Sequence, residues 1–66
     1  MKNTIKVERA IKDMTQQDLA TVIGVSRQTI NSMESGKYVP STVLALKISQ
    51  FFGKPVNEIF TLEEGD

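Results

Sequence analysis

The stretch QQDLATVIGVSRQTINSMESG, residues 16–36, decides the fold. Apolar residues recur at helical spacing on both sides of Gly24, so that each side predicts a short helix with one apolar face. Thr15 precedes the first helix and Ser26 precedes the second, and both are residue types that cap helix N-termini. Because glycine tolerates a positive φ, Gly24 can join the two helices through a tight turn. The stretch therefore predicts two helices that cross at a steep angle.

Upstream of this stretch, the sequence predicts a first helix over about residues 4–13. We expect its apolar residues to form one buried stripe, which consists of Ile5, Val7, Ile11 and Met14. The polar residues between them are expected to face solvent.

Downstream, two more helices and a short strand pair are expected. Ser41 is a suitable N-cap for a fourth helix that ends at Gly53, and its nearly continuous apolar positions place it at the centre of the core. Pro55 begins a fifth helix of one or two turns without a side-chain cap. Residues 61–62 are expected to pair as a brief strand with residues 1–3. The predicted fold class is all-α, with five helices.

Length and charge restrict the class of protein. A chain of 66 residues without Cys predicts one domain, residues 1–66, held together by apolar contacts. The formal net charge is zero, but residues 1–57 hold all eight basic residues and four acidic ones, and therefore carry a charge of +4. The other four acidic residues lie in residues 58–66, and those at 61–66 form an acidic tail. A mildly basic body suits contact with a phosphate backbone, whereas improved solubility explains the tail equally well.

The composition also argues against several functions. The chain has no His and no Cys, which are the usual groups for proton transfer, nucleophilic attack and metal binding. We therefore expect no enzyme activity, no metal site, no cofactor and no small-molecule ligand. No apolar stretch is long enough for a membrane span or a signal peptide, so the expected location is the cytoplasm.

The stretch resembles the helix-turn-helix of Cro/C1-type regulators, the XRE family of lambda-repressor-like domains. Their pattern is roughly (S/T)QxxLAxxxGVSxxxIxxxExG, and it is matched without a gap by Thr15, Gln16, Leu19, Ala20, Gly24, Val25, Ser26, Ile30, Glu34 and Gly36. The similarity extends from about residue 4 to residue 60 and includes Arg9, Pro40 and Phe60. It implies a five-helix lambda-repressor-like fold with the helix-turn-helix at about 16–36, and double-stranded DNA as the ligand.

In a helix-turn-helix, the second helix lies in the major groove. The base-reading candidates are Arg27, Gln28, Thr29, Asn31 and Ser32. Gln and Asn can form paired hydrogen bonds with adenine, and Arg can do so with guanine, each pair giving about 1–3 kcal/mol of discrimination. For Thr29, contact with a thymine methyl group and support of the Ser26 N-cap are equal alternatives. The resemblance implies that Gln28 and Ser32 are the main base readers. It implies that Arg27 either reads a base or binds a phosphate group, and that Asn31 supports either of these roles.

Phosphate contacts are expected on both sides of the reading helix. The candidates are Gln16, Gln17, Lys37 and Tyr38. For Gln17, an ordinary exposed position in the first turn of its helix is an equal alternative.

The resemblance also implies residues that serve the assembly of the domain. Arg9 and Glu34 lie where the family has a partly buried ion pair, so we expect a structural role for both. The candidates for a dimer interface are Phe52, Val56, Ile59 and Leu62, with closure of the monomer core as an equal alternative.

The leading functional hypothesis is a sequence-specific transcription regulator, a repressor that acts as a homodimer on a pseudo-palindromic operator in the nucleoid. Two modules related by a two-fold axis would double the recognised sequence. The alternative is an antitoxin or adaptor that uses the same fold mainly to bind another protein, which the zero net charge supports.

Overall fold

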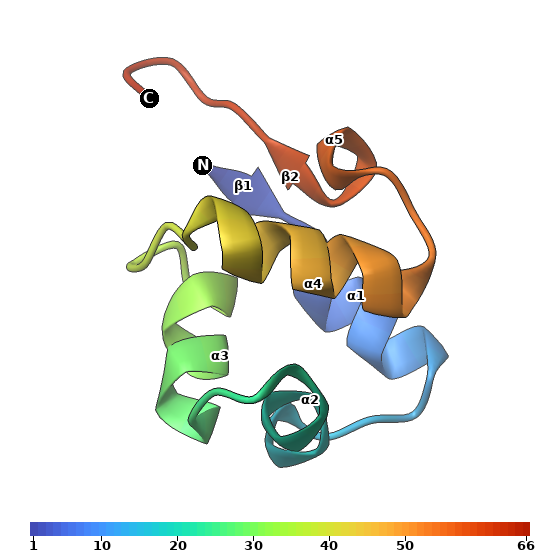
Figure 1. The fold of residues 1–66 in the computed structure, drawn as a ribbon. Coiled ribbons are helices and arrows are strands. Elements are labelled where there is room, and N and C mark those ends of the chain that lie inside the picture. Colours follow the sequence, from blue (N-terminus) through green and yellow to red (C-terminus); the bar gives the residue numbers. More distant parts are fainter.

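The structure, a computed structural model, describes residues 1–66 and contains five helices and one two-stranded sheet (Figure 1). In chain order the elements are β1 (Lys2–Asn3), α1 (Ile5–Ile11), α2 (Gln16–Ile23), α3 (Arg27–Glu34), α4 (Thr42–Phe52), α5 (Val56–Ile59) and β2 (Phe60–Thr61). The predicted helical fold with a short terminal strand pair is confirmed. The strands pair antiparallel, Lys2 with Thr61 and Asn3 with Phe60, so the second strand starts one residue earlier than expected.

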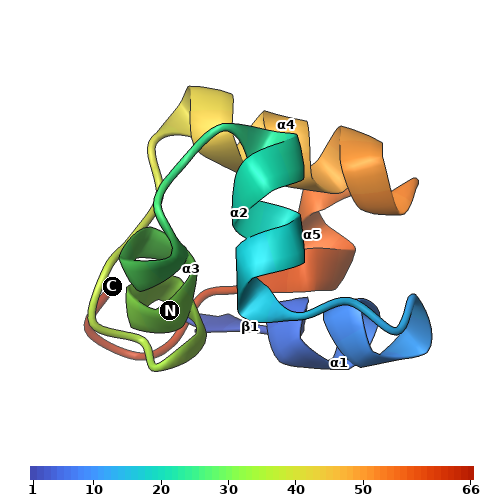
Figure 2. The ribbon, with the colours of Figure 1, turned by 90° about the horizontal axis from the view of Figure 1, so that it is seen from below.

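The helices are arranged around α2. Figure 2 shows α2 running between α1 and α4, which lie on opposite sides of the molecule, while α3 stands beside α2 at one edge. In the view of Figure 1 the sheet and α5 lie at the end of the molecule opposite to α2, and Figure 2 shows β1 beside α1. This arrangement holds α3 at the outside of the domain.

Side-chain caps fix the start of both helices in the helix-turn-helix. The hydroxyl of Thr15 accepts a hydrogen bond from the backbone N–H of Asp18 at 3.0 Å, and the Asp18 carboxylate accepts one from the N–H of Thr15 at 3.0 Å. The bond from the Thr15 backbone N–H to the carboxylate, followed by a smaller contribution of the Thr15 side chain, lowers the pKa of Asp18. The hydroxyl of Ser26 accepts the N–H of Thr29 at 3.1 Å. Gly24 has a φ of 90° and forms the turn between the helices, as its position in the sequence predicts.

Eleven buried apolar residues form the core. They are Ile5, Leu19, Ala20, Ile23, Ile30, Met33, Leu44, Ile48, Phe52, Ile59 and Phe60. All five helices contribute to this cluster, and β2 adds Phe60. Its burial is the main favourable contribution to folding in a chain that has no disulfide.

The predicted buried stripe of α1 is wrong for two of its four members. Val7 and Ile11 are 58% and 70% exposed, whereas the charged residue Glu8 is buried with Ile5. Residues two apart do not share a helix face, so Ile5 and Val7 cannot both face the core. Glu8 can be buried because its carboxylate accepts a hydrogen bond from the Lys54 ammonium at 2.6 Å.

Helix α4 also buries less than predicted. Leu44, Ile48 and Phe52 face the core at a spacing of four residues, but Val43 and Leu46 are 64% and 54% exposed. The helix therefore covers one side of the core instead of passing through its centre, and it leaves an apolar strip on the surface.

Candidate nucleic-acid interface

Helix α3 presents a polar side to solvent. Its inner side buries Ile30 and Met33, which hold it against the rest of the domain. On its outer side, Arg27, Gln28 and Asn31 are exposed, while Thr29 and Ser32 are half-buried. The five predicted base readers therefore lie on α3 with at least part of each side chain accessible.

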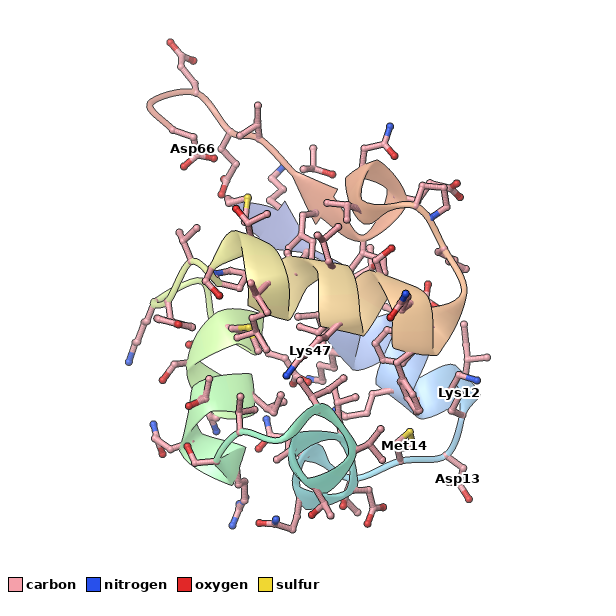
Figure 3. All side chains as sticks on the ribbon, in the orientation of Figure 1. Lys12, Asp13, Met14, Lys47 and Asp66 are labelled. Carbon is pink, nitrogen blue, oxygen red and sulfur yellow. The ribbon has the colours of Figure 1, made fainter.

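The acidic tail does not cover this side of α3. Asp66 lies on the far side of α4 from the N-terminal end of α3 (Figure 3). Its carboxylate and that of Glu63 contact the Met1 ammonium at 3.1 and 3.0 Å. The tail is thus held next to β1, and the exposed side chains of α3 remain open to solvent.

The loop after α3 completes one half of the polar surface. The N–H groups of Lys37 and Tyr38 both donate to the carbonyl of Ser32, at 2.9 and 3.2 Å, and this holds the loop against the last turn of the helix. A shallow hollow is lined by Gln28, Thr29, Ser32, Lys37 and Tyr38. The structure therefore brings three predicted base readers together with the two predicted phosphate contacts of the loop.

Thr29 takes part in the N-cap of α3. Its N–H donates to the hydroxyl of Ser26, and the two hydroxyl groups lie 2.9 Å apart. The Thr29 hydroxyl is thus occupied within the protein. A contact of its methyl group with DNA stays a prediction.

The other half of the surface lies at the N-terminal ends of α2 and α3. A second hollow is lined by Arg9, Ala10, Asp13, Met14, Thr15, Gln16, Gln17 and Arg27. It brings Arg27 together with both predicted phosphate-contacting glutamines. The Gln17 amide donates to the Thr21 hydroxyl one turn later at 3.2 Å, whereas the Gln16 amide donates to Glu34 at 3.2 Å.

Arg9 and Glu34 form the expected ion pair beneath this surface. Arg9 donates from Nε to Glu34 Oε2 at 2.8 Å and from Nη2 to Oε1 at 3.1 Å, and its Nη1 donates to the Met14 carbonyl at 2.9 Å. Burial of Glu34 raises the pKa of its carboxyl group, but hydrogen bonds from Arg9 and Gln16 and the charges of Arg9 and Lys6 outweigh burial and lower it. The hydrogen bonds to Glu34 raise the pKa of Arg9. Both groups are therefore charged, and both form their hydrogen bonds within the domain.

Two contacts of charged side chains were not predicted from the sequence. One is the Glu8–Lys54 pair, and its only sequence signal is that Glu8 lies three residues after the buried Ile5. The other is Lys12, whose ammonium lies 5.4 Å from the centre of the Phe51 ring. Both contacts connect α1 to the C-terminal end of α4 or to the residues just after it.

Two of the four predicted dimer residues have little surface. Phe52 is 8% exposed and Ile59 is completely buried, since both belong to the monomer core. Val56 is half-buried and Leu62 is 78% exposed. Val56 lines a groove without charged side chains, called the uncharged groove below, together with Met1, Val39, Pro40, Thr42, Ala45, Leu46 and Phe60. No helix combines the length and the apolar character that a membrane span requires.

Comparisons with known proteins agree with this geometry. The family described as Helix-turn-helix matches residues 5–59. The chain is 52% identical over 66 residues to an uncharacterised HTH-type transcriptional regulator of Methanocaldococcus jannaschii, and the match covers all of both chains. It is 45% identical over 64 residues to the uncharacterised HTH-type transcriptional regulator YgzD of Bacillus subtilis, with 97% of each chain covered. It is also 33% identical over 66 residues to the ImmF control region 10 kDa protein of Bacillus phage phi105, covering 92% of this chain and 73% of the phage protein. The chain therefore belongs to the Cro/C1-type helix-turn-helix family of DNA-binding transcriptional regulators.

Proposed function

We propose that this regulator is a repressor that binds a pseudo-palindromic operator as a homodimer, in the cytoplasm and on nucleoid DNA. It acts by binding alone and needs no cofactor or catalysis. The observation that carries the proposal is the exposed polar side of α3, with one group of candidate phosphate contacts on each side of the helix. A bound repressor excludes polymerase from the DNA that it occupies.

The arrangement of side chains supports a division of roles. Gln28, Asn31 and Ser32 share the outer side of α3, where amide and hydroxyl groups can read base edges in the major groove. The Gln28 amide lies 3.4 Å from the Ser32 hydroxyl, so these two side chains can contact neighbouring base pairs as a unit. Arg27, at the start of the helix, can bind a guanine or a phosphate group.

The flanking residues can position the domain on the DNA backbone. Lys37 and Tyr38 lie at one side of α3, and Gln17 lies with Arg27 at the other. Contacts of this kind give affinity and orientation without reading sequence. Two such groups on either side of one helix suit the two phosphate backbones that border a major groove.

A dimer would use the uncharged groove and the apolar strip on α4. Val39, Val43, Leu46 and Leu62 are the exposed apolar residues in or near this region. One domain measures 31 Å in its longest dimension, and successive major grooves on one face of DNA are about 34–36 Å apart. Two copies side by side would therefore reach both half-sites. Val56 and Leu62 stay in this interface, whereas Phe52 and Ile59 support it from the core.

Selection of bound sequences from a random pool of double-stranded DNA tests the proposal directly. We expect a consensus with two-fold symmetry and half-sites one helical turn apart. Binding to this consensus should weaken steeply as salt rises, because each neutralised phosphate adds about 0.9 to the slope of log affinity against log salt. Failure to enrich any sequence, or affinity that does not respond to salt, would instead favour an antitoxin or adaptor that binds protein.

A further inference from the structure

Gln16 connects the buried ion pair to the reading side of α3. Its amide nitrogen donates to Glu34 Oε1 at 3.2 Å, and its amide oxygen accepts from Asn31 Nδ2 at 3.5 Å. Glu34 is in turn held by two hydrogen bonds from Arg9. A continuous series of hydrogen bonds thus runs from α1 through the end of α3 and the start of α2 to Asn31, an exposed residue of the reading helix.

The charge of Glu34 fixes which way the Gln16 amide faces. An ionised carboxylate can only accept hydrogen bonds, so it selects the nitrogen of the Gln16 amide and not the oxygen. The Glu34 side chain is only 7% exposed and cannot turn away without leaving Arg9 unpaired. The oxygen of Gln16 must therefore face the other way, toward Asn31.

This orientation determines what Asn31 can offer to DNA. The Asn31 amide nitrogen carries two hydrogens, and it donates one of them in the hydrogen bond to Gln16. The second hydrogen and the oxygen remain free, and these are the donor and acceptor that bind N7 and N6 of adenine. Asn31 is exposed, so both groups are accessible.

We propose that Gln16 is a positioning residue for specificity, which orients Asn31 to read an adenine and is itself oriented by Glu34. The proposal rests on the proposed function, since it requires α3 to read bases. It goes beyond a phosphate contact for Gln16, because such a contact would affect all DNA sequences equally. The buried ion pair then contributes to base preference although neither of its members touches a base.

Gln17 provides a matched control. It lies in the same first turn of α2 and has the same side chain, but its amide donates to the Thr21 hydroxyl and forms no hydrogen bond with α3. Gln16→Met and Gln17→Met each replace one amide side chain by an apolar side chain of about the same length. A role in phosphate binding predicts the same kind of change for both variants, whereas positioning of Asn31 predicts a change of specificity for Gln16→Met alone.

The experiment measures affinity for the selected consensus and for every single base-pair change in one half-site. Asn31→Ala identifies the base pair that Asn31 reads. We expect Gln16→Met to lose most of the adenine preference at that same base pair, which a good bidentate contact sets at about 5- to 150-fold. Gln17→Met is expected to weaken binding evenly across all sequences. Circular dichroism checks that each variant folds, and Gln16→Ala replaces Gln16→Met if the latter does not.

Three results would overturn the inference. Gln16→Met could weaken all sequences evenly, as Gln17→Met does. Gln16→Met and Asn31→Ala could relax the preference at different base pairs. Asn31→Ala could also leave every preference unchanged. Each of these results leaves sequence-specific binding intact, whereas absence of any consensus for the unmutated protein would contradict the proposed function itself.

Discussion

Arg9 of α1 and Glu34 at the end of α3 are joined by two hydrogen bonds, of 2.8 and 3.1 Å, although they lie 25 residues apart in sequence. Their side chains are 15% and 7% exposed. The pair connects the first helix to the end of the reading helix.

Removal of one partner should therefore destabilise the domain. Arg9→Met leaves the Glu34 carboxylate buried without its counter-ion, and we expect the free energy of unfolding to fall by about 3–5 kcal/mol. Urea denaturation followed by circular dichroism measures this change. The double variant Arg9→Met/Glu34→Leu removes both charges and should recover part of the loss. Equal stability of the single and double variants would argue against an unpaired buried charge as the cause.

Acid should destabilise the domain through Glu34 and Asp18. Folding lowers the pKa of both carboxyl groups from their ordinary values of 4.5 and 3.8. A group with a lowered pKa contributes stability above its unfolded pKa, and this contribution is lost as the pH falls through the folded pKa. We expect the urea midpoint to decrease as the pH falls below about 4.5.

Asp18→Asn separates the share of the capping box from that of Glu34. The Asn side chain cannot lose a charge, so the urea midpoint of this variant should depend less steeply on pH than that of the unmutated protein. The same slope in both proteins would show that the Thr15–Asp18 capping box does not contribute to the acid sensitivity.

The N-caps of α3 and α4 allow stability and DNA binding to be separated. Ser26 accepts the N–H of Thr29 at 3.1 Å, and Ser41 accepts the N–H of Leu44 at 3.2 Å. Each Ser→Ala variant should lose about 1 kcal/mol of stability. Only Ser26→Ala is expected to weaken binding to the selected DNA as well, because it loosens the turn that carries Gln28. Equal DNA affinity of the two variants would count against insertion of this end of α3 into the groove.

Base readers and phosphate contacts should respond differently to truncation. Gln28→Ala should relax the preference at one base pair by about 1–3 kcal/mol and leave the others unchanged. Lys37→Ala should weaken binding to all sequences and lower the salt slope by about 1. A filter or fluorescence titration against the single-change DNA set at several salt concentrations measures both effects. Retained preference in Gln28→Ala would remove Gln28 from the set of readers.

The helix-turn-helix was predictable because its determinants are local. Thr15, Gly24 and Ser26 fix the helix starts and the turn through contacts within a few residues, and the helical period places the readers opposite Ile30 and Met33. These features depend on the order of residues along the chain and on little else.

Burial in α1 and the partner of Gln16 depended on distant residues. Glu8 is buried because Lys54, 46 residues away, supplies its counter-ion, so a stripe of apolar residues alone pointed to the wrong face. In the same way, the Gln16 amide binds Glu34, 18 residues away, and the spacing of Gln16 within its own helix gives no sign of this. No pattern in the sequence marks either contact, whereas the Arg9–Glu34 pair was expected from the family resemblance.

The exposed apolar strip of α4 gives a test of dimer formation. Leu46 is 54% exposed and lines the uncharged groove, whereas Ile11 on α1 is 70% exposed and does not line it. Leu46→Glu should prevent dimer formation, because a buried charge without a counter-ion is costly, while Ile11→Glu should leave the dimer intact. Sedimentation of both variants measures their mass in solution. If Leu46→Glu is a folded monomer, it should bind a single half-site as well as the unmutated protein does but lose affinity for the full operator. A dimer that persists in Leu46→Glu and dissociates in Ile11→Glu would move the interface from the groove beside α4 to the outer face of α1.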